Sequence, residues 1–398
     1  MSLERYIIMK KNALQFTILI IGYSLFYFIV TTTIYFFSMS QNSNGISLSF
    51  FGGGDDGKFY YEQATSVAKN IPYVYTSIHA LILGWLLKIF NTDSVYLLRF
   101  FNYFANLGLL IISLLLLKKV MSNKQAFGIS STILIVILVC YPSLLLNTTL
   151  SLYRDVWIYV YFLWSIYLFS NIFIVKEKFS ISVNALLLIY TMFMLGGYRK
   201  YALLCFLAGS LAYLVMKFIS RNKISLKKFI YIVFIGFTVF YLVLRSFKFP
   251  IVGLSFSDVL LYRQTSLEIG GSQMGISLEQ SNIVLFYINY LYSIISNLIG
   301  PLPWQISGVS TLFLMISEGI VFLIVLLFLY RRRRSFSNLE KYFLIQSIIW
   351  FILIGISNDN FGTGSRLRIV GWLPLLILFS KYYGEYLYNK LLLTRLSK

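Results

Sequence analysis

Charged residues are scarce in this sequence. Only 12% of its 398 residues are Asp, Glu, Lys or Arg, and 58% are hydrophobic. Soluble domains usually contain about 25% charged residues. A water-soluble chain of this length could not bury so much apolar surface in one core. The scarcity of charge therefore excludes a soluble protein and predicts that most of the chain lies in lipid.

Histidine and cysteine are also rare. His79 is the only histidine, which excludes a histidine-based zinc or haem cluster. Cys140 and Cys205 lie inside apolar stretches and provide neither a disulfide framework nor metal-ligand spacing. The chain also lacks a P-loop, a dinucleotide-binding fingerprint and the protein-kinase motifs, so nothing in it indicates ATP-driven work.

Acidic residues are outnumbered by basic ones, 14 to 34, and such an excess can indicate nucleic-acid binding. Here the basic residues form short clusters between apolar runs, a pattern typical of the positive-inside rule. The clusters are Lys10-Lys11, Lys118-Lys119, Lys176 with Lys178, Arg221 to Lys228, and Arg331 to Arg334. We therefore expect the lipid bilayer, including anionic headgroups, as a partner, and no nucleic acid.

Hydrophobic runs close to the roughly 20 residues of a membrane-spanning helix recur along the chain. They lie at about 13–37, 95–117, 127–145, 156–175, 181–197, 201–219, 228–246, 308–330, 341–357 and 368–388. Two further runs, 72–90 and 282–299, are interrupted or awkwardly flanked. The sequence thus predicts an all-α polytopic membrane protein with about 10–12 transmembrane helices.

The basic clusters help to interpret the two interrupted runs. If every cluster lies in the cytoplasm, an even number of crossings must separate neighbouring clusters. We therefore predict that 72–90 and 282–299 are re-entrant or interfacial helices. The alternative is twelve crossings with some clusters outside. On the ten-crossing map the polar loops 38–71 and 247–281 face outward and form a small cap on a single transmembrane domain, 1–398.

The first of these loops contains an acidic pair, Asp55-Asp56, between a glycine run and the aromatic residues Tyr60 and Tyr61. Adjacent carboxylates on a glycine-rich turn can place one acid as a general base and the other as its support or as a cation ligand. A solvated acidic turn is the alternative. The chain has few acids, which favours a catalytic role for Asp55 or Asp56.

A second acid, Asp155, follows Arg154 at the outer mouth of the 156–175 run. An acid at a helix start often serves only the free backbone donors and the helix dipole. Functionally, Asp155 would be a second catalytic carboxylate that faces the same site as the acidic pair, with Arg154 and Tyr60 binding substrate.

Basic residues at two outward turns run against the positive-inside bias. Arg366 and Arg368 precede Trp372-Leu373-Pro374, and their planar guanidinium groups match phosphate oxygens. Pairing with Asp359 or Asp155 is the structural alternative. Arg199-Lys200 forms a second basic turn, for which snorkelling at the membrane surface is the alternative to substrate binding.

Three single residues also deserve a prediction. Arg99 opens the 95–117 run at its outer end and can line the same cavity, and His79 can touch substrate, although a lone histidine is more often structural. Glu318 lies in the middle of an apolar run, so it should face the protein interior with a partner or stay protonated.

The order of these features resembles the membrane-embedded glycosyltransferases of fold class C, which include lipid-A aminoarabinose and protein mannosyl transferases and use polyprenyl-linked sugars. The resemblance implies that Asp55 or Asp56 is the first-loop acid, acting as a base or helping to hold a divalent cation, and that Asp155 is the second outward acid. Arg366 and Arg368 have no equally firm counterpart, and chemistry alone assigns them to the donor phosphate. The large carboxy-terminal soluble domain of that family is missing, which leaves the acceptor unspecified.

The size, aromatic content and long loops also resemble the O-antigen and capsule repeat-unit polymerases of bacterial inner membranes. Both resemblances imply transfer of a sugar or a repeat unit from a polyprenyl carrier, such as undecaprenyl pyrophosphate, on the outer face. Saccharide acceptors and other polysaccharide-assembly proteins are the partners implied. The alternative is a flippase for lipid-linked saccharides, against which stand the lack of an inverted repeat and the gathering of polar residues on one face.

Overall fold

The computed structural model describes residues 3–48, 56–72, 74–175, 181–222, 225–248, 253–265, 272–280 and 282–396. Helices dominate these residues, and none of them belongs to a β-strand. Extended backbone pairs only at isolated bridges, which join Lys248 to Ser255 and Gln273 to Asn360. The predicted all-α class is therefore confirmed.

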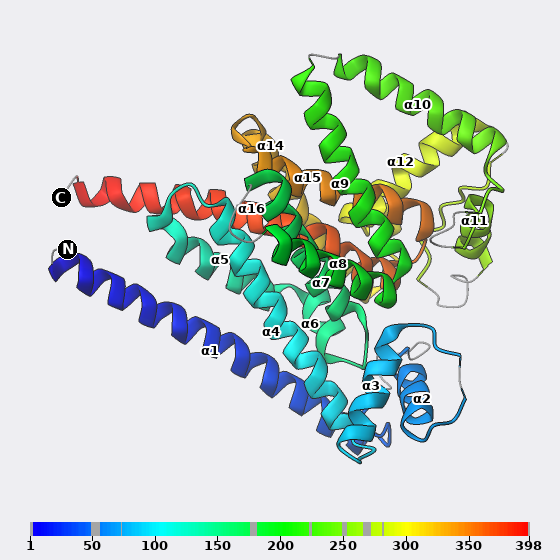
Figure 1. Cartoon of the computed structure of the whole chain (residues 1–398), viewed down its shortest axis with the longest axis horizontal. Coiled ribbons are helices and arrows are strands. Elements are labelled where there is room, and N and C mark those ends of the chain that lie inside the picture. The colour runs from blue at the N-terminus through cyan, green and yellow to red at the C-terminus, as the bar shows by residue number, and fades with distance from the viewer. Residues whose placement is uncertain are drawn as a thin grey trace. The chain divides into compact units, whose positions relative to one another are not determined.

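The chain forms two compact units. The first contains Met1–Arg199 and Leu375–Lys398, and the second contains Lys200–Pro374. The helices of the first unit are α1 (Leu3–Ser40), α2 (Asp56–Ala68), α3 (Ile78–Ile89), α4 (Val95–Val120), α5 (Phe127–Cys140), α6 (Pro142–Thr149), α7 (Asp155–Ser170) and α8 (Ile181–Tyr198). Helix α1 packs against α4 and α5, and α4 packs against α7 (Figure 1).

The second unit begins with α9 (Lys200–Arg221). It continues with α10 (Leu226–Val243), α11 (Phe256–Thr265), α12 (Ile283–Ile299), α13 (Val309–Leu314), a π-helix (Met315–Ile320), α14 (Val321–Arg332) and α15 (Asn338–Ser357). Helix α16 (Phe361–Leu396) starts in this unit and ends in the first, with Pro374 at the boundary.

Long apolar helices make the chain a membrane protein. Among the described residues seven helices are long and apolar enough to cross a bilayer, or eight if the pair α5–α6, bent by 63°, is one span. The ten full-length runs predicted from sequence all lie on helices. The number of crossings and their orientation stay predictions.

The two interrupted runs form the shorter apolar helices α3, of 12 residues, and α12, of 17 residues. At a rise of about 1.5 Å per residue, α3 is about 18 Å long, less than the roughly 30 Å of a hydrocarbon core. Helix α3 by itself is therefore too short to span, and the re-entrant or interfacial placement of α3 and α12 stays a prediction.

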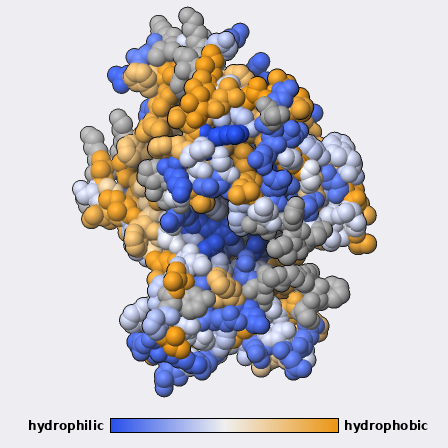
Figure 2. All heavy atoms as spheres, turned by 90° about the vertical axis from the view of Figure 1, so that its right-hand side faces the viewer, coloured by the Kyte–Doolittle hydropathy of each residue, from blue (hydrophilic) through white to orange (hydrophobic). Residues whose placement is uncertain are grey.

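Large apolar side chains cover much of the molecular surface. Leu186 and Phe193 on α8 are 69% and 67% exposed, and Figure 2 shows wide hydrophobic areas (orange) next to hydrophilic ones (blue). Contiguous apolar surface of this extent is unfavourable in water but is what lipid tails contact. The lower part of that view shows hydrophilic and hydrophobic areas side by side.

The loop predicted at 38–71 contains a helix, α2. Helices α2 and α3 pack closely at Gly84, where an added Cβ would lie 2.4 Å from the Cβ of Val67. A small core joins them to the start of α4, with Tyr60, Ala64, Leu83 and Leu98 among its buried members. The site described below rests on this core.

The loop predicted at 247–281 likewise contains a helix, α11. Its buried Phe256 and Leu260 pack with Met274 and with Phe286 of α12 in a second small core. Each loop thus belongs to the core of its own unit, and a joint cap stays a prediction.

Candidate functional site

The acidic end of α2 provides one corner of the site. Asp56 is the first residue of this helix, where a carboxylate interacts favourably with the exposed backbone donors and the helix dipole. Its partner in the acidic pair, Asp55, lies outside the described residues. Tyr60 follows one turn later on the same face of α2 and is buried.

Arg154 meets Tyr60 from the segment that precedes α7. The guanidinium carbon lies 5.6 Å from the centroid of the Tyr60 ring, a cation–π geometry. Burial raises the pKa of the Tyr60 phenol to about 12, while the positive charges of Arg154 and Arg199 oppose the shift and Asp155 and Asp56 add to it. Tyr60 is therefore neutral at physiological pH, and all four charged side chains lie near enough to influence its pKa.

Asp155 and Arg199 form an ion pair between two helix ends. Asp155 begins α7 and Arg199 follows the last residue of α8, so each charge complements the dipole of its own helix. The Nη2 atom of Arg199 lies 3.4 Å from Oδ1 of Asp155, and both side chains are largely buried. Desolvated charges of this kind remain stable only when paired, so the pair fixes the two helix ends together.

His79 lies fully buried at the start of α3, beside the same tyrosine. Its Nε2 is 3.1 Å from the carbonyl oxygen of Leu152, so Nε2 must carry the proton and donate. Burial lowers the pKa of His79 to about 4, and the ring is neutral. The other nitrogen, Nδ1, is left as an acceptor without a hydrogen-bond partner among the described residues.

Aromatic side chains surround His79, and this cluster was not predicted from the sequence. The ring centroids of Tyr60 and Tyr198 lie 5.3 and 5.7 Å from that of His79, and Trp157 stacks on Phe101 at 4.5 Å. The hydroxyl of Tyr198 and Nε1 of Trp157 are buried without a partner in the described part of the chain. The position of Tyr198 beside Arg199 was the available signal, but a tyrosine in an aromatic-rich chain carries little information.

A glycine positions the end of α8 in this site. An added Cβ at Gly197 would lie 3.1 Å from Cγ2 of Ile78, so a side chain there would push α8 away from α3. The small residue thus brings Tyr198 and Arg199 close to His79. Gly197, in front of the basic turn, therefore has a packing role.

Arg99 is bonded to the backbone of its own unit. Its guanidinium donates to the carbonyl oxygens of Gly45, Ile46, Thr149 and Leu150 at 2.5 to 3.0 Å, and the side chain is buried. These bonds tie α4 to the segment that follows α1 and to the end of α6. Donors directed at backbone carbonyls indicate a structural role, and the substrate-binding role of Arg99 stays a prediction.

The remaining predicted residues belong to the second unit. Lys200 is exposed at the start of α9, and Arg366 is half-buried on α16. Arg368 is buried, donates to the carbonyl oxygen of Gly300 and forms an ion pair with Glu318. Glu318 therefore faces the interior with a partner, as predicted, although its pairing with Arg368 was not predicted. The phosphate-binding role of Arg368 stays a prediction, and its charge is already balanced.

Arg263 on α11 was missed by the sequence analysis. Its Nη2 pairs with Oδ1 of Asp359 at 2.9 Å, and the same side chain donates to Ser293 Oγ and to four backbone carbonyls, those of Ile276, Gly355, Ile356 and Asn358. This arginine holds together three segments far apart in sequence. Asp359, the structural alternative as a partner for Arg366 or Arg368, pairs with Arg263.

Metal-binding groups can be judged only in the described part of the chain. No group of three or more His, Cys, Asp or Glu side chains that could hold a metal ion occurs there. Asp55 lies outside that part, so the predicted divalent cation at the acidic pair stays untested.

A comparison of the chain with protein-family models, curated proteins and solved structures finds no match.

Proposed function

We propose that this membrane protein is a glycosyltransferase. It moves a sugar or an oligosaccharide repeat from a polyprenyl phosphate or pyrophosphate carrier to a saccharide acceptor, on the outer face of a bacterial cytoplasmic membrane, in the biosynthesis of a cell-surface polysaccharide. The observation that carries the proposal is the cluster of Asp56, Tyr60, Arg154, Asp155 and Arg199 at one end of the first unit.

In the proposed reaction Asp56 acts as the general base. Its carboxylate takes the proton from an acceptor hydroxyl as that oxygen forms a bond to the anomeric carbon of the donor. The bond from the anomeric carbon to the carrier phosphate breaks, and the phosphate leaves with the electron pair. General-base assistance of this kind contributes about 10²–10⁴-fold to a rate.

The basic side chains of the first unit have the charge that the leaving phosphate needs. Arg154 is held over Tyr60, and Arg199 is oriented by Asp155. Positive groups fixed in a poorly solvated site stabilise developing negative charge more strongly than they would in water. Asp155 then acts as a positioning residue for Arg199, while Arg366 stays a further phosphate ligand by chemistry alone.

The proposal is tested by reconstituting the purified protein in liposomes that contain a radiolabelled pool of polyprenyl-linked saccharides from the host membrane. Wild type should form a new glycosidic bond, and Asp56→Asn should lose at least about 100-fold in rate. Glu62→Gln removes the charge of an exposed acid on the same helix. It is the matched control and should keep the wild-type rate.

One outcome would overturn the assignment of the base, and another would overturn the transferase itself. If Asp55→Asn and Asp56→Asn both retain full activity, neither acid is the base. If no glycosidic bond forms while the labelled lipid changes leaflet, the protein is a flippase for lipid-linked saccharides.

A further inference from the structure

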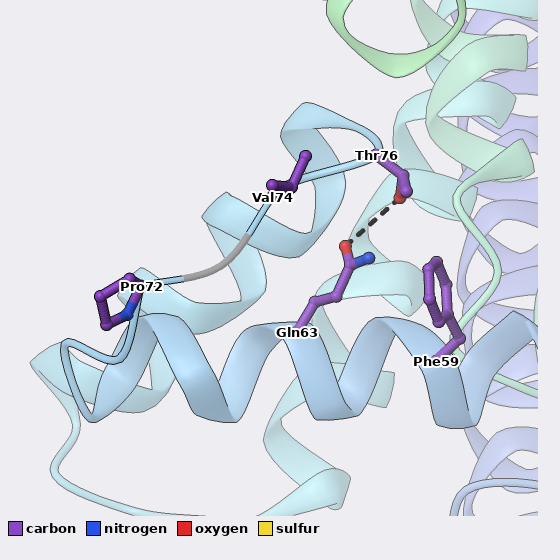
Figure 3. Close-up of a pocket in the computed structure, with 5 residues that line it drawn as sticks. All are labelled: Phe59, Gln63, Pro72, Val74 and Thr76. Carbon is purple, nitrogen blue, oxygen red and sulfur yellow. Dashed lines mark hydrogen bonds between the residues drawn. The ribbon is translucent and has the colours of Figure 1, made fainter.

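A hollow on the α2–α3 hairpin lies beside the candidate site. Its volume is about 570 Å³, and it is lined by Phe59, Gln63, Pro72, Val74 and Thr76 (Figure 3). Sites for small organic ligands usually have about 300–1,000 Å³. The hollow is open to the outside, as expected for a place where one part of a longer molecule lies.

The chemistry of this lining suits a neutral polar ligand. None of the five side chains carries a charge, which disfavours a phosphate. Phe59 is 41% exposed and presents a ring to the hollow, on which the C–H face of a sugar can pack. Gln63 and Thr76 provide an amide and a hydroxyl, groups that exchange hydrogen bonds with sugar hydroxyls.

Gln63 is the most informative residue of this set. Its side chain is fully buried, Thr76 Oγ1 donates to its Oε1 over 3.3 Å, and its Nε2 has no partner among the described residues. If the amide is turned over, the oxygen is the atom left without a partner. An unused polar group on a buried amide destabilises the fold unless a ligand completes its hydrogen bonds.

The hollow is aligned with the proposed base. Asp56, Phe59, Tyr60 and Gln63 occupy positions i, i+3, i+4 and i+7 of α2, so they share one helix face. Seven residues of helix span about 10 Å. A ligand that packs on Phe59 and bonds to Gln63 therefore extends along α2 towards Asp56.

We infer that this hollow binds the neutral saccharide part of the acceptor and directs its reacting hydroxyl to Asp56. The inference rests on the proposed function, since it assigns the second substrate of that reaction. Gln63 and Thr76 form hydrogen bonds with the hydroxyls of the saccharide, and Phe59 packs against its apolar face. The carrier phosphate is bound elsewhere, at the arginines.

The first test measures binding alone. Saccharides released by mild acid from the host's polyprenyl-linked pool are added to the full-length protein in lipid nanodiscs, and saturation-transfer NMR detects contact. Wild type and Asp56→Asn should both bind, whereas Phe59→Leu and Gln63→Leu should each reduce the signal at least fivefold. Phe90→Leu, which removes an exposed ring at the far end of α3, should bind as wild type does. Unchanged binding by both Phe59→Leu and Gln63→Leu would overturn the inference.

The second test uses transfer kinetics to keep the two proposals apart. Phe59→Leu should raise the KM for acceptor at least fivefold with an unchanged KM for the donor lipid, and Thr76→Val should do the same to a smaller extent. If transfer occurs with unaltered acceptor KM, the hollow is not the acceptor site but the transferase stands. If binding depends on Phe59 and Gln63 while no transfer occurs, the saccharide site stands and the transferase falls.

Discussion

Two regions of the molecule bury an arginine beside an aspartate, and they use the pair differently. Around Arg263, in the second unit, the guanidinium is surrounded by Asp359, Ser293 and four carbonyls. Around Arg199, in the first unit, buried polar atoms of His79, Tyr198 and Gln63 have no partner among the described residues. Buried polar groups are nearly always hydrogen-bonded, so the full set of partners on the guanidinium nitrogens of Arg263 indicates a structural role, and the unused atoms near Arg199 indicate a place for a ligand.

The largest expected effect is on the cluster around Arg263. Arg263→Ala should lower the free energy of unfolding by about 4 kcal/mol, because it leaves Asp359 without its counter-charge and several carbonyls without a donor. Unfolding in a titration with SDS, followed by tryptophan fluorescence, measures the change. Arg245→Ala, at an exposed position of the same unit, is the control and should have little effect. Equal stability of the two variants would show that Arg263 is not a structural centre.

The Asp155–Arg199 pair offers the matching experiment in the first unit. Asp155→Asn should destabilise by about 3 kcal/mol, because it leaves a largely buried guanidinium without a counter-charge. In the double variant with Arg199→Gln, part of this loss should be recovered, with a coupling energy of at least about 1 kcal/mol in the double-mutant cycle. Strictly additive effects would mean that the two side chains do not depend on each other.

His79 predicts a dependence of stability on pH. Its folded pKa of about 4 lies below the usual 6.5, so the unfolded chain binds the proton more readily. Stability is fully present above pH 6.5 and falls as the pH drops towards 4, by about 3 kcal/mol from this group. His79→Gln should remove that part of the slope in the same SDS titration. A slope identical to wild type would show that His79 is not the source of the dependence.

The smallest effect concerns the packing that supports the site. Gly84→Ala should destabilise by about 1–3 kcal/mol, because the new Cβ would meet Val67 and the α2 backbone. Gly128→Ala has open space around it and should be neutral or slightly stabilising, since alanine favours helix. Both are read from thermal unfolding, and a stable Gly84→Ala would mean that α2 and α3 separate easily.

The long apolar helices were predictable from the sequence because a helix that spans a bilayer needs a minimum number of apolar residues. The length of each apolar run can be compared with that minimum. The 127–145 run shows the limit of this reasoning, since it was predicted as one segment and bends between α5 and α6. Pro142 has no backbone N–H and begins α6 at its first turn, which makes the break understandable afterwards.

The site was predictable only where a rare residue type stood out. Asp56, Arg154, Asp155 and Arg199 could be named because charges are few. Arg99 and Arg263 show why the rest could not. Arg99 was predicted to bind substrate and Arg263 was not singled out at all, because the sequence does not show the carbonyls that surround them. Gln63 belongs to no motif, and only its burial with an unused amide group distinguishes it.

The division of the chain also has a consequence for its synthesis. The second unit is one continuous stretch inserted between α8 and the last part of α16. That last part anchors the segment after α4, where Lys381 donates to Ser122, the Ser122 amide donates to Glu385, and Tyr388 donates to Gln125. A ribosome delivers these residues only after the whole second unit has been made. The first unit therefore lacks these contacts during synthesis and gains them only when the last part of α16 has been made.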